Sequence, residues 1–232
     1  MKLLFLCFIL IAFVIAIIGH EQKLLRQRDL YIYNLPPEAR FRLPACLFRQ
    51  VCKRLFDIFF SVTVLLTVFP VLFIIIAPLV KLSSPGPVFF AHKRLGLYGK
   101  LFKCYKFRTM YQNSGSAPVK VNDTRITRLG KLLRKTHLDE FPQFFNVLIG
   151  EMSIVGPRPF SEIVYQKDLT SNISFLRLTV RPGITGLAQM NVPRNYNPKR
   201  TIQNDLYYIR RLSLWRDIQI VFRTLQLKDN SY

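Results

Sequence analysis

Two long apolar stretches lie in the first third of the chain, and neither has the periodic pattern of a surface helix. Residues 3–18 are sixteen consecutive apolar residues, and residues 58–80 contain no charged side chain. Because a helix that crosses a bilayer needs roughly 20 residues, both stretches are predicted to enter a membrane. We expect residues 1–20 to form an N-terminal hydrophobic anchor. A cleaved signal peptide is the alternative, although no small-x-small cleavage site precedes His20.

Basic side chains flank both stretches and predict their orientation. Those that follow the first stretch outnumber those before it, which places the residues after it in the cytoplasm. The second stretch has basic residues on both sides, so a helix bent at Pro70 would enter and leave the membrane on one face. We therefore expect a re-entrant helix at residues 51–82, with a kinked spanning helix as the alternative. Asp57 is expected to pair with Arg54, three residues earlier on the same helical face.

The segments outside these stretches are polar or alternate between polar and apolar positions. Residues 21–50 are mostly polar and are predicted to be a linker with one short helix. Strand-like runs at residues 88–91 and 101–109 are separated by a turn that contains Gly96 and Gly99, which predicts a β-hairpin.

Two later stretches have the spacing of amphipathic helices. Apolar residues recur on one face at residues 126–133 and 214–225, with basic residues on other faces. A basic amphipathic helix beside a membrane element suits anionic lipids, and a solvated basic face over an ordinary core is the alternative. The predicted fold class is α+β and mainly helical. We expect a monotopic membrane protein with a re-entrant Pro-kinked helix, amphipathic surface helices, a small β-hairpin and a cytosolic domain at residues 83–232.

Composition narrows the choice of partners. The 232 residues include 34 Lys+Arg and 13 Asp+Glu, for a net charge of +21, but half are hydrophobic and 20 are Phe. This apolar content excludes a disordered basic tail. No zinc-finger, KH-type or RNP-type motif is present, so the sequence predicts no nucleic-acid partner. Four scattered Cys and three His indicate neither a zinc site nor a disulfide framework.

Among these basic residues, Asp139 and Glu140 form an adjacent acidic pair. Pro142 fits the first turn of a helix that begins near Asp139. The two carboxylates would then lie at the positive end of that helix, where anions are stabilised. Simple N-terminal capping by Asp139 is the alternative.

Two proline-containing loops each present an arginine. One is Gly156-Pro157-Arg158-Pro159 and the other runs from Arg181 to Gly186. A guanidinium group suits phosphate oxygens, and a glycine such as Gly183 lets a backbone amide approach a ligand closely. Taken alone, each loop is also consistent with an ordinary turn.

A set of short motifs occurs in a fixed order between Lys53 and Leu225. The motifs are Lys53-Arg54-Leu55-Phe56-Asp57, Tyr105-Lys106-Phe107-Arg108-Thr109-Met110, Leu138-Asp139-Glu140-Phe141-Pro142-Gln143, Asn146-Val147-Leu148, Gly150-Glu151-Met152-Ser153, Val155-Gly156-Pro157-Arg158-Pro159 and Arg181-Pro182-Gly183-Ile184-Thr185-Gly186. Together they resemble the bacterial monotopic phosphoglycosyl transferases, also called the bacterial sugar transferase family.

The resemblance implies an enzyme that transfers a sugar 1-phosphate from a UDP-sugar to a polyprenyl phosphate, usually undecaprenyl phosphate, and releases UMP. This reaction is the first membrane step of a surface polysaccharide or glycoconjugate, and downstream glycosyltransferases are expected partners. The resemblance implies that Asp139 is the nucleophile, that Glu140 completes the pair and that Mg²⁺ binds beside Asp139. It also implies the bacterial inner membrane, with the catalytic domain on its cytoplasmic face.

A carboxylate that attacks a diphosphate needs cations to neutralise the charge, which explains a basic chain with one acidic pair. The expected substrate-binding residues are Arg134, Arg158, Arg181, Lys106, Arg108 and Gly183. Weaker candidates for the site are Asp205, Lys53 and Arg54. Anionic membrane lipids are expected partners of the basic helices. The alternative function is a catalytically silent membrane scaffold of a glycan assembly complex, against which the intact acidic pair argues.

Overall fold

The computed structural model describes residues 2–34, 47–112, 114–115, 122–160, 174–191 and 198–226, and most of these residues are helical. The helices are α1 (Lys2–Tyr33), α2 (Leu47–Ser83), α3 (Arg128–Lys135), α4 (Gln143–Ile149), α6 (Leu187–Asn191), α7 (Pro198–Arg210) and α8 (Leu214–Gln226). The strands are β1 (Phe89–Leu95), β2 (Leu101–Phe107), β3 (Ser153–Val155) and β4 (Gly183–Thr185). Short 3₁₀ segments occur at Leu97–Gly99, Leu138–Glu140 and Ser174–Thr179. The mainly helical fold with a small antiparallel hairpin is thus confirmed.

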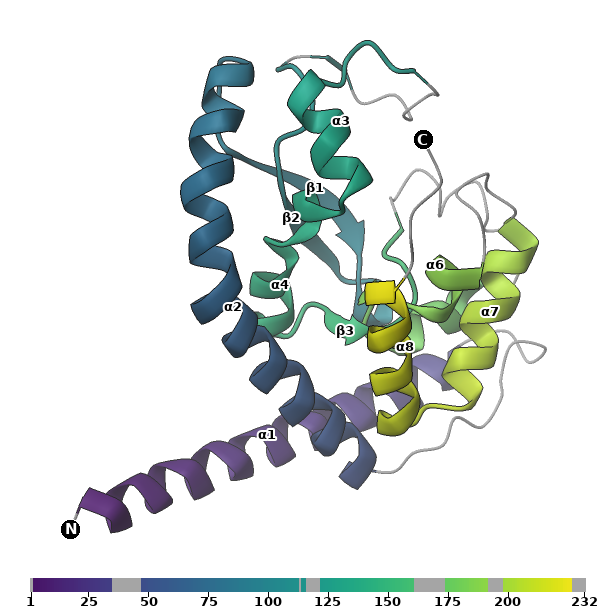
Figure 1. Cartoon of the computed structure of the whole chain (residues 1–232). Coiled ribbons are helices and arrows are strands. Elements are labelled where there is room, and N and C mark those ends of the chain that lie inside the picture. The colour runs from purple at the N-terminus through teal and green to yellow at the C-terminus, as the bar shows by residue number, and fades with distance from the viewer. Residues whose placement is uncertain are drawn as a thin grey trace.

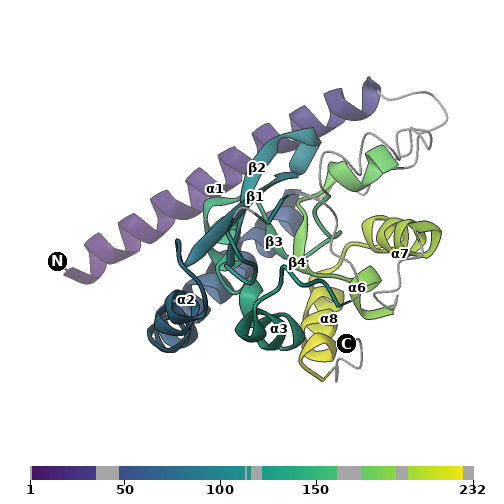
Figure 2. The same cartoon turned by 90° about the horizontal axis from the view of Figure 1, so that it is seen from above.

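Helix α1 runs without a break from the apolar stretch into the segment predicted to be a linker. Its N-terminal part projects away from the rest of the molecule, and its later part passes the hairpin (Figures 1 and 2). Residues 21–33 are rich in Leu, Lys, Arg and Gln, which are good helix formers, and contain neither Gly nor Pro. The helix therefore continues to Tyr33, and the described part of the predicted linker begins as helix.

Helix α2 is uninterrupted although Pro70 and Pro78 lie inside it. Each proline removes one helical hydrogen bond. Before Pro70, the hydroxyls of Thr63 and Thr67 donate to carbonyls four residues earlier, at 2.9 and 2.7 Å. Prolines inside a helix and threonine hydroxyls bonded to its carbonyls both bend helices. Figure 1 shows that α2 changes direction along its length. Both α1 and α2 are long and apolar enough to cross a membrane.

The strands β1 and β2 form the predicted hairpin, in which Phe89 lies opposite Phe107. These two rings stack at 5.4 Å between centroids. Both rings also stack on phenylalanines of α2: Phe107 on Phe69 at 6.1 Å, and Phe89 on Phe73 at 5.7 Å. Aromatic packing of this kind adds to the burial of apolar area. One face of the hairpin is therefore fixed against the second membrane element.

A second, parallel pair of strands lies deeper in the molecule, where β3 runs beside β4. Every residue of β3 is buried. Around it lies the main core, which takes side chains from β2, α4, α7 and α8. The members of this core are Phe102, Cys104, Phe144, Val147, Met152, Ile154, Val155, Tyr208, Ile209 and Ile220.

Arg54 and Asp57 do not form the ion pair that the sequence suggested. Arg54 donates instead to two backbone carbonyls at the end of α4, at 2.7 and 2.9 Å. Asp57 accepts hydrogen bonds from the Ser153 hydroxyl and the Ile154 amide, both at 3.1 Å. The last carbonyls of a helix lack partners and form its negative end, which explains why α4 attracts the arginine.

Candidate active site

Asp139 and Glu140 lie in a 3₁₀ turn between α3 and α4. The helix that was predicted to begin near Asp139 begins at Gln143, so that prediction was wrong by one turn. His137, at φ 56°, reverses the chain direction after α3, and a new helix starts only after Pro142. The carboxylates are therefore fixed by a tight turn and its neighbours, and they precede the helix instead of capping it.

Glu140 is held by two cations from different elements. Its Oε1 accepts a hydrogen bond from Lys106 Nζ of β2 at 2.5 Å and another from Arg158 Nη2 at 3.2 Å. Burial alone would raise the pKa of Glu140, but Lys106 and Arg158 outweigh it and hold the pKa well below its ordinary value. Glu140 is therefore an ionised brace between the hairpin and the loop after β3.

Asp139 has a different environment. The residue is only 6% exposed, and its carboxylate makes no hydrogen bond or ion pair within the described parts of the chain. Burial raises the pKa of Asp139 and the neighbouring Glu140 adds to the rise, whereas Lys106 and Arg134 oppose it. A buried carboxylate with unused lone pairs, close to cations, is available to a ligand or to a reacting atom.

Arg134 reaches this site from the last turn of α3. Its Nε donates to the Thr109 hydroxyl at 2.8 Å, which fixes the side chain against the end of β2. Helix α3 is itself anchored there, because Thr127 caps it by accepting from the Gly130 amide at 2.9 Å. A Cβ on Gly130 would lie 2.0 Å from the Thr109 carbonyl oxygen, so only glycine permits this close approach.

Arg158 follows β3 and Gly183 begins β4, and the two segments are joined by backbone hydrogen bonds. The Gly183 amide donates to the Pro157 carbonyl at 2.9 Å. A Cβ on Gly183 would lie 2.1 Å from the Gly156 nitrogen, so glycine is needed for packing. The Gly183 amide is thus occupied by Pro157 and does not face a ligand. Arg158 itself is half exposed, with its guanidinium on Glu140.

Two predicted phosphate ligands are committed to other parts of the protein. Arg181 donates to the Glu21 carboxylate of α1 at 2.7 Å and to the Gly150 carbonyl at 3.1 Å. Arg108 donates to the carbonyls of Val80, Ser84 and Pro85 at the end of α2. Both arginines therefore hold the fold together, and none of their described contacts is with the acidic pair.

The three weaker candidates also lie outside the acidic pair's contacts. Lys53 donates to Asp217 of α8 at 2.7 Å, and Arg54 closes α4 as described above. Asp205 is paired with Arg177 at 2.6 Å. All of these side chains are largely buried and join separate elements, which indicates a structural role.

Arg94 is a site residue that the sequence analysis missed. It lies on β1 directly opposite Phe102, on the hairpin face that also carries Cys104 and Lys106. Burial lowers the pKa of Arg94, and the charges of Glu140 and Arg158 also act on it. Within the described residues its guanidinium has no hydrogen-bond partner. Arg94 could have been found from the register of the hairpin. If β1 is extended past residue 91, the alternation of side chains puts Arg94 on the same face as Lys106.

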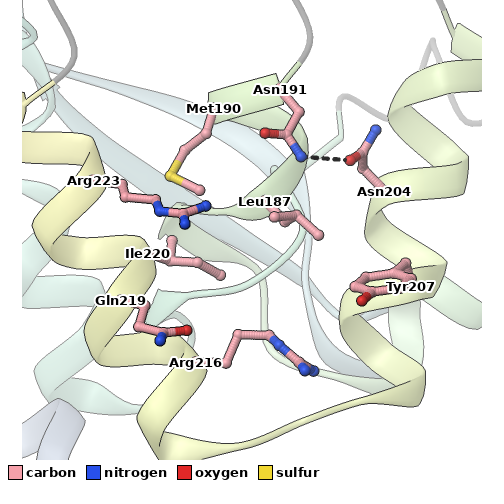
Figure 3. Close-up of a pocket in the computed structure, with 9 residues that line it drawn as sticks. All are labelled: Leu187, Met190, Asn191, Asn204, Tyr207, Arg216, Gln219, Ile220 and Arg223. Atoms are coloured by element: carbon pink, nitrogen blue, oxygen red, sulfur yellow. Dashed lines mark hydrogen bonds between the residues drawn. The ribbon is translucent and has the colours of Figure 1, made fainter.

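A separate open pocket of about 390 Å³ lies between α6, α7 and α8 (Figure 3). Its lining residues are Leu187, Met190, Asn191, Asn204, Tyr207, Arg216, Gln219, Ile220 and Arg223. Asn191 donates to Asn204 at 2.9 Å across its rim. Among the described residues that line it there is no carboxylate, and none of them belongs to the acidic pair or its cations. The acidic pair and this pocket are therefore two separate candidate sites.

Comparison with known proteins gives consistent matches. The model of the family described as bacterial sugar transferase matches residues 48–228. The chain is 42% identical over 213 residues to a UDP-glucose:undecaprenyl-phosphate glucose-1-phosphate transferase of Klebsiella pneumoniae, covering 88% of this chain and 45% of that protein. It is 44% identical to a UDP-N-acetylgalactosamine-undecaprenyl-phosphate N-acetylgalactosaminephosphotransferase of Aeromonas hydrophila, covering 75% and 43%. An exopolysaccharide production protein, PSS, of Rhizobium leguminosarum bv. phaseoli is 42% identical, covering 75% and 94%. The chain thus spans less than half the length of the first two relatives.

Proposed function

Because this chain belongs to the bacterial sugar transferase family, we propose that it transfers a sugar 1-phosphate from a UDP-sugar to undecaprenyl phosphate and releases UMP. Two of the relatives are named for this reaction with different sugars, and a third is named for exopolysaccharide production. The observation that carries the proposal is the buried, unbonded carboxylate of Asp139 beside a Glu140 that Lys106 and Arg158 hold ionised.

In the first step, an Asp139 carboxylate oxygen attacks the phosphorus that bears the sugar. The bond from this phosphorus to the bridging oxygen breaks, and UMP leaves with that electron pair. The product is a phosphosugar joined to Asp139 as an acyl phosphate. The raised pKa of Asp139 makes its carboxylate a stronger nucleophile once it is ionised.

In the second step, an oxygen of undecaprenyl phosphate attacks the same phosphorus. The bond to Asp139 breaks and the carboxylate is restored, which yields undecaprenyl-diphosphate-sugar. A single site thus serves a water-soluble donor and a lipid acceptor in turn. This sequence predicts ping-pong kinetics.

Cations around the pair would hold the donor's phosphates during both steps. Arg158, Arg94 and Arg134 surround the acidic pair from three different elements, and fixed positive groups stabilise the transition-state charge. Glu140, as an anion bound to both Lys106 and Arg158, keeps these two cations in position. Arg181 and Arg108 are not included in this group of cations, because Arg181 is paired with Glu21 and Arg108 is bonded to carbonyls at the end of α2.

Mg²⁺ fits this site with Asp139 as its protein ligand. No cluster of three His, Cys, Asp or Glu side chains occurs in the described ranges, but Mg²⁺ commonly uses one or two carboxylates plus substrate phosphates. Asp139 has unused carboxylate oxygens for such a role. When bound, the ion would neutralise charge on the donor's diphosphate.

We also propose a membrane arrangement for α1 and α2. We place residues 1–20 as an anchor and residues 51–82 as a re-entrant helix of the bacterial inner membrane. The domain at residues 83–232 then lies on the cytoplasmic face, in contact with anionic lipids and beside downstream glycosyltransferases. The basic flanks of α2, the bend and the exposed apolar side chains along it support this arrangement.

The reaction is tested by measuring UMP release from a panel of UDP-sugars with undecaprenyl phosphate and Mg²⁺ in detergent. We expect release with one donor, a loss of at least about 10³-fold in Asp139→Asn, and loss on chelation. Asp29→Asn is the matched control, because that carboxylate is exposed on α1. Release that survives Asp139→Asn would exclude this nucleophile, and no release from any donor by folded protein would favour the scaffold.

The re-entrant course of α2 has its own test. Single cysteines at Arg49 and Leu82, in a chain without its native cysteines, are exposed to a membrane-impermeant maleimide. If α2 is re-entrant, both react in inside-out vesicles and neither reacts in right-side-out vesicles. Labelling of Leu82→Cys from the opposite side to Arg49→Cys would establish a spanning helix instead.

A further inference from the structure

The N-terminal helix is joined to the catalytic region by a buried ion pair. Glu21 of α1 is 1% exposed, and its carboxylate accepts hydrogen bonds from Arg181 at 2.7 and 3.4 Å. The two residues are 160 positions apart in the sequence. A buried carboxylate needs a partner of opposite charge, so this contact fixes where α1 meets the rest of the protein.

From Arg181 the connection continues through the backbone toward the site. The Gly183 amide donates to the Pro157 carbonyl at 2.9 Å, and the Ser153 amide donates to the Pro182 carbonyl at 2.8 Å. A Cβ on Gly156 would lie 2.5 Å from the Arg181 carbonyl oxygen, so the two backbones are in direct contact. The loop that Glu21 holds is therefore packed on the residues just before Arg158.

A second contact joins α1 to the hairpin tip. The Tyr98 hydroxyl donates to the Leu24 carbonyl at 2.8 Å, and the rings of Tyr98 and Tyr31 lie 5.6 Å apart. Tyr98 belongs to the turn between β1 and β2, the strands that carry Arg94 and Lys106. Helix α1 thus touches two of the three structures that supply cations to the acidic pair, the hairpin and the loop before Arg158.

We propose that α1 belongs to the catalytic unit through Glu21, Leu24 and Tyr31, and that Glu21 is a positioning residue, which acts through Arg181 to hold Arg158 against Glu140. Only the role of Arg158 in donor binding rests on the proposed function. The mechanical link from Glu21 to the loop before Arg158 stands on the contacts alone. If α1 served only to tether the protein to the membrane, it would not need a buried ion pair such as Glu21–Arg181 with the rest of the protein.

The link is tested by amide hydrogen exchange on the full chain in detergent, which requires no activity. In Glu21→Gln we expect peptides covering residues 153–158 and 181–186 to exchange about tenfold faster than in the wild type. Lys23→Gln, which removes an exposed charge from the same helix, should leave both peptides unchanged. Unchanged exchange in Glu21→Gln would overturn the proposal whatever the enzyme's activity.

Kinetics then separate positioning from folding. With the donor that the wild type uses, Glu21→Gln is expected to raise the KM for that donor about tenfold, and Glu21→Asp to restore part of the loss. Fewer folded molecules would lower only the apparent kcat. A donor KM equal to that of the wild type would therefore overturn the positioning role.

If Arg181, left without its partner, prevents folding of Glu21→Gln, the double variant Glu21→Gln/Arg181→Gln removes both charges together. We expect this variant to fold, and to show the faster exchange and the raised donor KM. Wild-type exchange and KM in the double variant would overturn the proposal.

Discussion

Asp139 and Glu140 are consecutive residues, yet their surroundings push their pKa values in opposite directions. Lys106 and Arg158 bind Glu140 directly and lower its pKa, whereas burial without a bonded partner raises that of Asp139. Pairs of carboxyl groups with separated pKa values often divide the chemical work between them. In the proposed reaction, Glu140 is the structural brace and Asp139 is the carboxylate that attacks.

This separation predicts the pH dependence of kcat/KM. Asp139 must be ionised to attack, and because its pKa is raised, activity should rise with pH through a value above that of an exposed Asp. Lys106→Met removes a cation that lowers this pKa, so the acidic limb should move to higher pH. Lys103→Met, on an exposed position of β2, is the control and should leave the limb in place. A limb that stays fixed in Lys106→Met would contradict the assignment.

Arg158 and Arg223 provide a matched comparison. Arg158→Gln removes a cation beside the acidic pair, and kcat/KM for the UDP-sugar should fall about 100-fold. Arg223→Gln makes the same chemical change in the pocket between α6 and α8, and should stay within about twofold of the wild type. Equal losses in both variants would place the donor's phosphates in that pocket.

Sequence patterns predicted the longer helices and the hairpin, and they singled out the acidic pair as a candidate site. They did not predict contacts between segments that are distant in the sequence. The hairpin and the amphipathic helices were visible because their periodicity extends over several residues. Strands β3 and β4 have three residues each, which is too short for any period to show. Arg181 was assigned to the phosphates because its partner Glu21 lies in a helix outside the recognised motifs.

The close pairing of β3 and β4 gives a stability prediction. In Gly183→Ala the new methyl group would lie 2.1 Å from the Gly156 nitrogen, and backbone cannot move aside cheaply. We expect the free energy of unfolding to fall by about 3 kcal/mol, seen as a lower midpoint in thermal or denaturant unfolding. Gly19→Ala, where nothing lies within 4 Å of the new methyl group, should be neutral or slightly stabilising.

Across the whole molecule, exposed basic residues gather beside the membrane elements. Helix α3 lies next to the later part of α2 in both views (Figures 1 and 2). It exposes Arg128, Lys131 and Lys135, together with the apolar Leu132. Arg125, in contrast, is bonded to Asp123 at 2.8 Å. A surface of this kind suits the boundary between anionic head groups and acyl chains.

We therefore expect reversal of the charges at Arg128, Lys131 and Lys135 to weaken attachment to anionic liposomes. The reason is the loss of about 1 kcal/mol of attraction for each basic residue near the surface. Liposome flotation measures this, and zwitterionic vesicles serve as the control because the reversal should have no effect on them. Unchanged flotation on anionic vesicles would show that α3 faces solvent.

Arg108 also bears on the order of events during synthesis. Its guanidinium bonds the carbonyls of Val80, Ser84 and Pro85, where α2 ends, and the Ser84 partner lies 24 positions earlier in the chain. Synthesis proceeds from the N-terminus, so Arg108 is added to the chain only after the whole of α2 has been made. The last turn of α2 therefore gains these hydrogen bonds only when β2 has formed beside it, and the end of the helix and the hairpin complete their folding together.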